Sequence, residues 1–206
     1  MKSKPTKADI ILGLLRKEKD EETLIEAIRD VNLLGPTLSV INGLVDQGLI
    51  DAYAIGGGAA VLYYCEPVLT DDFDVFCHFP GSGTLIDPSP VFEYLREKGY
   101  GFESQDKVVI GGVPVRFVAA AAGGLTEEAV ENALEIDVQG ERARIFAPEY
   151  LLANMIDLGR PKDRAKISIM MDEAGGATVD RKKLKKILAR YKLTAKWNRF
   201  FPEFKL

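Results

Sequence analysis

Asp72 and Asp74 are two carboxylates separated by one residue in the apolar stretch "DDFDVFCHF" (71–79). Such a stretch predicts a buried strand, on which alternate side chains share a face about 7 Å apart. Phe73 and Val75 would then point the other way, into the core. Two like charges on one partly buried face repel each other, and a divalent cation offsets that cost directly. The pair therefore predicts a site for Mg²⁺ or Mn²⁺ with Asp72 and Asp74 as ligands.

Three glycines, Gly56, Gly57 and Gly58, come before this stretch and follow the short apolar run "IDAYAI" (50–55). Glycine lets the backbone approach a phosphate closely, and the N-terminus of a helix starting at Ala59 favours anions. Taken alone, three glycines more often mark a tight turn, and a lone D-x-D is more often solvated. The order of strand, glycine turn, helix and D-x-D strand is what favours a metal–nucleotide site.

The elements around this stretch predict an α+β fold with a mixed sheet. Helical spacing extends over residues 5–32 with a break near 19–22, and a new helix is expected after Pro36. Further strands are expected at 50–55, 71–79, 101–106, 107–112 and 113–121, with a hairpin at 133–147 that turns at Gly140. Further helices are expected at 59–64, 90–99, 125–134, 148–159, 161–175 and 180–192.

The domain organisation follows from this order of elements. We expect an N-terminal helical segment over residues 1–50, packed on an α/β core over 51–147, and a C-terminal helical region over 148–206. The 206 residues, of which 47% are hydrophobic and 28% charged, are typical of a globular protein without a membrane span. Two cysteines at unrelated positions make neither a disulfide framework nor a metal spacing, which favours a cytoplasmic setting.

Charge is distributed unevenly along the chain. Residues 181–199 hold nine of the 27 basic residues and none of the 31 acidic ones. This basic segment could bind RNA phosphates, dock on the acidic body, or contact an acidic protein partner. The aromatic residues that follow Tyr191 are too apolar for a free tail, so we expect them to pack on the body or on a partner.

The stretches "AIGGGAA", "EPVLTDDFDVF", "IGGVPVRFV", "LTEEAVENA" and "APEYLLANMIDLGRPKDRAKI" together resemble the nucleotidyltransferase-fold superfamily of DNA polymerase β type. The resemblance is to its small bacterial branch, which includes toxins of abortive-infection and toxin–antitoxin systems. It implies that Asp72 and Asp74 are catalytic Mg²⁺ ligands and that the substrate is an NTP. It also implies transfer of a nucleoside monophosphate to a hydroxyl on a protein, an RNA or a small molecule. The predicted nucleotide-binding residues are Gly56, Gly57, Gly58, Thr70, Arg160 and Lys162.

The sequence departs from the superfamily at its third carboxylate, which usually lies on a later strand and helps to activate the acceptor hydroxyl. The corresponding stretch here is "PVRFVAA" (114–120), in which Arg116 or a neighbour takes that place. Asp137, in the predicted hairpin, is the alternative source of an acid. Without a third acid, a metal that activates the attacking hydroxyl is less well held.

A second departure concerns the lysine that the superfamily often carries on a helix, because Asn154 stands near that place here. The neighbouring "GRPKDR" (159–164) supplies three cations, Arg160, Lys162 and Arg164, that could bind phosphates. The same residues equally suit the start of a helix, with Pro161 in its first turn and an acid at its positive end.

Three functions follow as hypotheses from these observations. The first is a Mg²⁺-dependent nucleotidyltransferase. The second is a catalytically degenerate, nucleotide-binding member of the same fold, suggested by the missing third acid. The third is an interaction protein of a toxin–antitoxin pair, suggested by the acidic body and the basic, apolar C-terminal segment.

Overall fold

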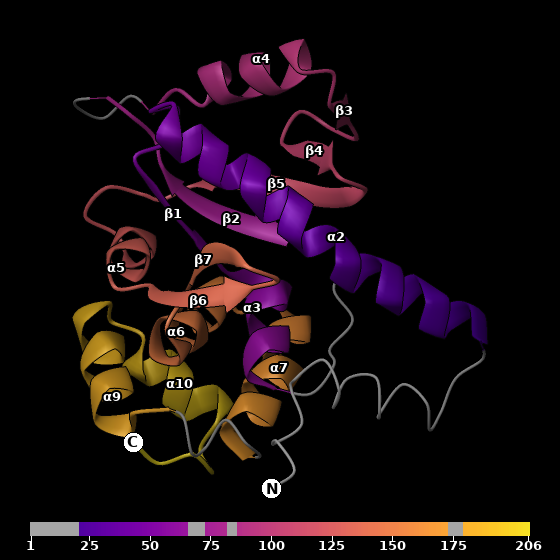
Figure 1. Cartoon of the computed structure of the whole chain (residues 1–206). Coiled ribbons are helices and arrows are strands. Elements are labelled where there is room, and N and C mark those ends of the chain that lie inside the picture. Colours follow the sequence, from indigo (N-terminus) through magenta and orange to yellow (C-terminus); the bar gives the residue numbers. More distant parts are fainter. Residues whose placement is uncertain (1–20, 66–72, 82–85, 173–178) are drawn as a thin grey trace, which may run out of the picture.

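A computed structural model describes residues 21–65, 73–81, 86–172 and 179–206. Within these ranges the chain forms a seven-stranded mixed sheet with helices against both faces (Figure 1). The predicted α+β class is therefore confirmed. In the same ranges, no helix combines the length and the apolar character needed to cross a membrane.

The sheet has the strand order β3-β4-β5-β2-β1-β7-β6. The strands are β1 (Ala52–Ile55), β2 (Phe73–His78), β3 (Gly101–Phe102), β4 (Lys107–Ile110), β5 (Val113–Ala119), β6 (Leu134–Val138) and β7 (Glu141–Ile145). The central strand β2 pairs antiparallel with β1 and parallel with β5. In the β2–β5 register Asp74 lies opposite Arg116, so two charged residues become neighbours in the middle of the sheet.

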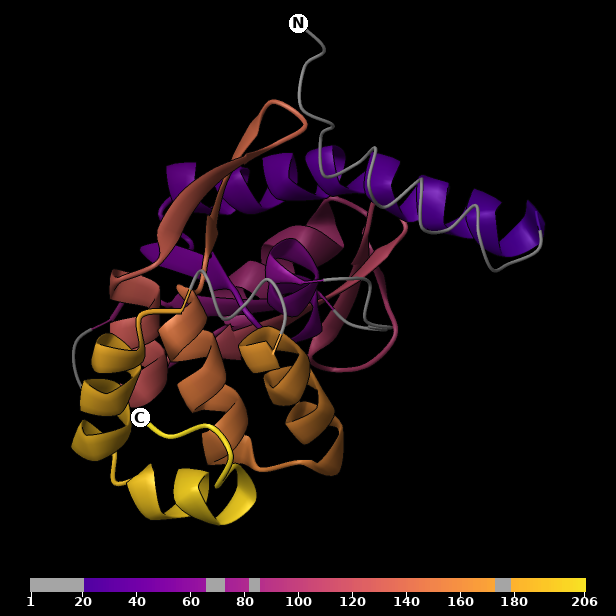
Figure 2. The same ribbon diagram turned by 90° about the horizontal axis from the view of Figure 1, so that it is seen from below.

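The hairpin between β6 and β7 turns at Gly140, as the sequence predicts. Its turn residues Gln139 and Gly140 have φ values of 59° and 82°, in the left-handed region that glycine adopts without strain. The hairpin extends away from the C-terminal helices (Figure 2). There the side chain of Gln139 accepts a hydrogen bond from the backbone N–H of Gly35 at 2.9 Å.

The long helix α2 (Glu21–Asp46) corrects the prediction of a new helix after Pro36, because the helix continues through that proline. Proline removes one backbone donor and normally breaks or kinks a helix. Here Leu38, Ile41 and Leu44 are buried on the C-terminal half of α2, which lies across one face of the sheet. Because Gly35 contacts the hairpin just before the proline and these apolar residues are buried after it, the helix packs on the rest of the fold on both sides of Pro36.

The remaining described helices, apart from α10, follow the predictions closely. They are α3 (Gly57–Tyr64), α4 (Ser89–Glu97), α5 (Leu125–Glu131), α6 (Pro148–Leu158), α7 (Pro161–Asp172), α9 (Arg181–Arg190) and α10 (Thr194–Phe200). Both α5 and α3 contact β2 on the face opposite α2, and α6 packs against α3, α5, α7 and α9. The buried helix α6 therefore connects the sheet to the C-terminal helices.

The aromatic C-terminal segment packs on the body, as expected, although α10 itself was not predicted. Trp197 is buried, and its indole N–H donates to the backbone oxygen of Phe204 at 3.0 Å. The ring of Phe201 lies 5.4 Å from that of Trp197, centroid to centroid. These aromatic contacts account for the apolar character of the segment.

Candidate functional site

Asp74 occupies the second position of β2, where the strand alternates between two faces. Phe73 and Val75 are buried on the opposite face, as predicted. The side chain of Asp74 remains 17% exposed. A carboxylate is therefore presented at one end of the central strand with a path to solvent.

Gly57 lies against this carboxylate at the N-terminus of α3. Its φ of 57° is a left-handed conformation, and a Cβ built on it would fall 2.1 Å from Oδ2 of Asp74. The neighbouring Gly56 donates its backbone N–H to the backbone oxygen of Asp74 at 3.0 Å. The glycine turn is thus required by the close approach of α3 to β2, which explains Gly57 sterically whatever the site binds.

Arg116 lies beside Asp74 on the parallel strand β5, and the family resemblance placed Arg116 or a neighbour at this position. Its Nη1 is 3.6 Å from Oδ1 of Asp74, and its Nε is 3.3 Å from Oδ2 of Asp106. Asp106 lies just before β4 and also accepts a hydrogen bond from Ser104 at 2.7 Å, which lowers its pKa. The guanidinium thus lies between the carboxylate of Asp74 on β2 and that of Asp106, just before β4.

Lys166 is the site residue that the sequence reasoning missed. It is only 9% exposed on α7, a helix that contacts α3. Burial lowers its pKa, whereas the nearby carboxylates of Asp163 and Asp74 act in the opposite direction. Asp163, Lys166, Ile167 and Met170 are all buried at helical spacing, and this pattern could have indicated Lys166 from the sequence.

The three basic residues of "GRPKDR" have different surroundings. Arg160 makes a bidentate contact with the buried carboxylate of Asp163, at 2.6 and 3.2 Å, and α7 begins at Pro161. The helix-start interpretation is therefore confirmed for these residues. The guanidinium of Arg164 lies 3.8 Å from the ring centre of Phe200, whereas Lys162 is exposed in the first turn.

Three predicted or alternative site residues lie elsewhere. Asp72 and Thr70 lie outside the described residues. Asp137 is on the edge strand β6, three strands from β2, and accepts a hydrogen bond from the backbone N–H of Gly140 at 3.2 Å. It therefore does not replace the third acid beside Asp74. In the described ranges, no group of three or more His, Cys, Asp or Glu residues could hold a metal ion.

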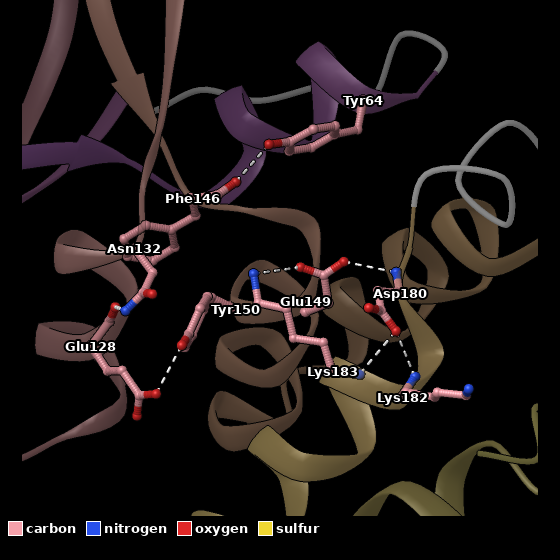
Figure 3. A network of polar contacts seen from close by, with 9 residues as sticks. All are labelled: Tyr64, Glu128, Asn132, Phe146, Glu149, Tyr150, Asp180, Lys182 and Lys183. Atoms are coloured by element: carbon pink, nitrogen blue, oxygen red, sulfur yellow. Dashed lines mark hydrogen bonds and ion pairs between the residues drawn. The ribbon is translucent and has the colours of Figure 1, made fainter.

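A second group of charged residues joins the C-terminal helix α9 to α5 and α6 (Figure 3). Glu149 is buried, accepts a hydrogen bond from the backbone N–H of Asp180 at 2.8 Å and pairs with Lys183 at 3.3 Å. The carboxylate of Glu128 accepts a hydrogen bond from Tyr150 at 2.8 Å. Tyr191 and Arg190 also donate to Glu128. We call these residues the C-terminal junction: Glu128, Glu149, Tyr150, Asp180, Lys183, Arg190 and Tyr191.

The junction answers one question that the sequence left open, because the basic helix does dock on the acidic body. Lys183 and Arg190 pair with acids of α6 and α5. Asp180 caps α9 by accepting from the backbone N–H groups of Lys182 and Lys183 at 2.8 and 3.0 Å. Other basic side chains of α9, among them Lys182, Lys185 and Lys186, remain exposed.

Comparisons with known proteins bear on the fold. No protein-family model matches the sequence, and no curated protein does. Among solved structures, an antigenic nucleotidyltransferase-like protein from Paracoccidioides brasiliensis matches with a TM-score of 0.53 at 17% identity, over 83% of this chain and 93% of that one. The chain has a nucleotidyltransferase-like fold.

Two structures of ANT(2'')-Ia also match this chain. The solution structure of that antibiotic-resistance factor has a TM-score of 0.48 and 15% identity, over 84% of this chain and 96% of that one. The crystal structure of its complex with adenylyl-2''-tobramycin has a TM-score of 0.46 and 17% identity, over 79% and 97% of the two chains.

The fold therefore brings together the carboxylate of Asp74 on β2, the side chains of Arg116 on β5 and Lys166 on α7, and the glycine turn that begins α3. An anion bound there would meet Lys166, Arg116 and the backbone N–H groups that begin α3. A cation bound there would meet Asp74. The arrangement suits a ligand that carries both, such as a metal-bound phosphate chain.

Proposed function

We propose that this protein is a nucleotidyltransferase that transfers a nucleoside monophosphate from a metal-bound NTP to an acceptor, with release of pyrophosphate. The observation that carries the proposal is the position of Asp74. Its carboxylate lies against the glycine turn of α3, beside Arg116 and within electrostatic reach of Lys166. The fold supports the class of reaction. The position of Asp74 between the glycine turn, Arg116 and Lys166 supports placing the site there.

The residues present fit a single Mg²⁺ or Mn²⁺ ion. Mg²⁺ is commonly bound by one or two carboxylates together with phosphates of the substrate. Asp74 supplies one carboxylate on the described strand, and Asp72 is the second in our proposal. When bound, the ion would neutralise charge on the phosphates and polarise the α-phosphate for attack.

The protein's own groups would bind and orient the phosphate chain. The backbone N–H groups of Gly57 and Gly58 open α3, where the helix dipole favours negative charge. Lys166 is poorly solvated, so a phosphate would relieve the cost of its burial and gain a charge-assisted hydrogen bond. Lys162, exposed one turn before Lys166, is available for the outer phosphates, whereas Arg160 is committed to Asp163.

A second candidate function is favoured by Arg116. In place of a further acid, a guanidinium lies 3.6 Å from Asp74 and competes with a metal ion for that carboxylate. A member of the fold that binds nucleotides without transferring them, for example as half of a toxin–antitoxin pair, would tolerate such a residue. The two functions share nucleotide binding and differ only in whether the α-phosphate is transferred.

The test combines binding with product formation. Each NTP, with and without Mg²⁺, is titrated calorimetrically into the wild type, Asp74→Asn and the control Asp137→Asn. We expect metal-dependent binding in the wild type and the control, weakened by at least about 100-fold in Asp74→Asn. Label from α-³²P-NTP is then followed into protein, into added RNA and into small molecules.

Each result has a distinct meaning. Binding and transfer that both require Asp74 support the nucleotidyltransferase. Binding without any transferred label favours the degenerate nucleotide-binding protein. Equal binding by the wild type and Asp74→Asn, or no binding of any NTP, would overturn the location of the site and the proposed function with it.

A further inference from the structure

Helix α9 lies at the outside of the molecule, against α6, and its two sides differ in character (Figure 1). One side packs on the body through three buried apolar residues, Leu184, Ile187 and Leu188. The other side carries four exposed cations, which at 3.6 residues per turn fall within about 140° of one another around the helix axis. We call them the basic face: Arg181, Lys182, Lys185 and Lys186.

The contacts that fix α9 to the body leave the charge of the basic face in place. Among the described residues, acids of the body pair with Lys183 and Arg190 of this helix. Lys182 contributes its backbone N–H to the helix cap, and its side chain extends away from the C-terminal junction (Figure 3). Lys185 donates to the backbone oxygen of Leu206 at 2.9 Å and remains exposed. The basic face is thus held in position without being neutralised by acids.

The basic face also carries an electrostatic cost for the helix. Arg181 and Lys182 lie in the first turn, where the helix dipole disfavours positive charge, and that turn contains no acidic residue. Like charges four residues apart repel, and both Arg181 with Lys185 and Lys182 with Lys186 have this spacing. A helix side that is merely solvated usually carries acids and bases four residues apart, which attract each other. This arrangement therefore favours a surface whose charge is neutralised by a partner.

We propose that the basic face binds the phosphate backbone of an RNA. A nucleic-acid backbone is a closely spaced row of negative charges, and the cations that neutralise it release its counterions. All 31 acidic residues of the chain lie outside residues 181–199, so the rest of the chain repels a polyanion and confines it to this region. The basic face lies outside the proposed nucleotide site, so RNA binding does not depend on nucleotide transfer.

The packing of α9 makes a membrane surface a poor partner. A helix that binds in a membrane surface inserts its apolar side among the lipid chains. The apolar side of α9 is already packed on the body, where Leu184, Ile187 and Leu188 are at most 4% exposed. A bilayer could therefore hold α9 by charge alone.

An acidic protein also fits this surface less well than RNA. A specific protein interface has an apolar centre surrounded by a polar rim. The exposed large apolar residues of the described chain all lie outside α9 and α10: Tyr63, Ile86, Leu134 and Leu158. The basic face offers charges without such a centre, which favours a partner that is recognised by its backbone charge.

The way in which α9 lies on the body favours RNA over double-stranded DNA. A helix reads B-form DNA by entering the major groove, so it has to project from the protein. Helix α9 instead lies flat against α6. The minor groove of A-form RNA is wide and shallow and displays 2′-hydroxyls beside the phosphates, so a flat basic surface can contact it without insertion.

The test measures RNA binding without nucleotide or divalent metal. A fluorescein-labelled RNA hairpin is titrated with the full chain, and fluorescence anisotropy gives the Kd at salt concentrations from about 50 to 200 mM. Neutralising about four phosphates should make log Kd rise with log[salt] with a slope of about 3. This slope reports the number of cations that contact the backbone.

Two variants with the same loss of charge separate the basic face from the net charge of the chain. Three substitutions make the basic-face variant: Arg181→Gln, Lys182→Gln and Lys186→Gln. Three substitutions of exposed cations on or next to α4 and on β7 make the control: Arg96→Gln, Lys98→Gln and Arg142→Gln. We expect the basic-face variant to bind RNA at least about 10-fold more weakly at low salt, with a slope smaller by about 2. The control should stay within a few-fold of the wild type.

Urea unfolding and calorimetry show whether the basic-face variant is otherwise intact. Because the three cations oppose the helix dipole and one another, their removal should leave the urea midpoint unchanged or raise it. Affinity for Mg–NTP should be unchanged, because none of the three residues belongs to the proposed nucleotide site. Weaker RNA binding by a variant with these properties is a direct effect on the surface.

Other anionic partners are compared at the same ionic strength: a DNA hairpin of the same sequence, polyglutamate and vesicles that contain phosphatidylserine. RNA binding that is tighter than these and depends on the basic face supports the inference. It is overturned if the wild type does not bind RNA at low salt, or if the basic-face variant binds RNA as tightly as the control. Binding of DNA, polyglutamate or vesicles as tight as that of RNA also overturns it. No nucleotide is present, so a failure of NTP binding overturns the proposed function alone.

Discussion

Two groups of charged residues in this protein differ in the contacts that surround their charges. At the C-terminal junction, Glu128 and Glu149 accept several hydrogen bonds from neighbouring helices, among them 2.8 Å bonds from Tyr150 and from the backbone of Asp180. Beside the glycine turn, an Asp74 carboxylate oxygen lies 3.6 Å from Nη1 of Arg116, and burial lowers the pKa of Lys166, which disfavours its charged form. The first group is arranged to hold helices together, and the second is arranged so that a ligand would improve it.

The difference matters because an interaction that stabilises the folded protein leaves its groups less able to bind a ligand, and the reverse also holds. A carboxylate that has its full set of donors stabilises the fold and has little to offer a ligand. A charged group whose charged form is disfavoured by burial lowers the stability of the fold slightly. The same charged form is stabilised when a ligand of opposite charge binds beside it. Substitutions in the two groups should therefore move stability and nucleotide binding in different combinations.

The largest effect is expected from Gly57→Ala, which disturbs the site through its backbone. The new Cβ would fall 2.1 Å from Oδ2 of Asp74, on a residue whose φ is 57°. We expect a loss of about 2 to 3 kcal/mol in the free energy of unfolding and a drop of at least about 100-fold in Mg–NTP affinity. Denaturant unfolding and calorimetry measure the two quantities.

Gly48→Ala is the matched control for this substitution. Gly48 has a similar φ of 68°, but a Cβ built there would meet nothing within 4 Å. It should cost only about 1 to 2 kcal/mol, from the backbone conformation, and leave nucleotide affinity unchanged. If the two variants lose the same stability and the same affinity, the close packing of Gly57 on Asp74 has no functional meaning.

The next effect is expected from Lys166→Met, which tests whether the site trades stability for binding. Burial lowers the pKa of Lys166, so its charged form is disfavoured in the folded protein. Replacing it with an apolar side chain of similar length should leave the free energy of unfolding unchanged or raise it by up to about 1 kcal/mol. Mg–NTP affinity should fall by about 10- to 100-fold, as measured by calorimetry.

Lys186→Met is the control here, because Lys186 is exposed on α9 and far from the glycine turn in sequence. It should change neither quantity. A variant of Lys166 that loses stability but keeps its nucleotide affinity would show that this lysine is structural. The contrast between the two groups of charges would then disappear.

Lys166 also illustrates why part of the site could not be predicted from the sequence. That Asp74 and Arg116 lie on strands was predictable from their apolar stretches, and the family resemblance placed Arg116 or a neighbour at the position of the third acid, but the direct pairing of the two residues was not predicted. Lys166 lies on a helix more than 90 residues after Asp74, and only tertiary packing of α7 on α3 brings the two together. Its burial among Asp163, Ile167 and Met170 was visible as a helical pattern, but the partner across the fold was not.

The same reasoning applies to the fold. Hairpin and strand positions followed from local signals such as Gly140 and alternating apolar residues. The continuity of α2 through Pro36 did not, because proline is locally a signal for a helix boundary and the contacts that α2 makes around it, such as that of Gly35 with Gln139 over 100 residues later, are tertiary. The docking of α9 likewise depends on Glu128 and Glu149, acids that composition alone could not pair with particular basic residues.

The smallest effect concerns the junction and its dependence on pH. Burial alone would raise the pKa of Glu128, but hydrogen bonds from Tyr191, Tyr150 and Arg190 lower it overall below the ordinary value of 4.5. A carboxyl with a lowered pKa in the folded state stabilises the protein above its unfolded pKa, and that contribution is lost as pH falls through the folded value. Glu128→Gln should therefore cost about 1 to 2 kcal/mol at neutral pH.

This cost should shrink as the pH falls from about 4.5 through the lowered pKa of Glu128 in the folded protein, below which the wild-type carboxylate is protonated as well. Urea unfolding of the wild type and Glu128→Gln between about pH 3 and pH 7 measures the change. Glu131→Gln, an exposed change on the same helix α5, should show no such pH-dependent difference, and both variants should bind Mg–NTP as the wild type does. A loss of nucleotide binding in Glu128→Gln would show that the junction and the glycine turn act as one unit, and the division between a stabilising and a binding group of charges would not hold.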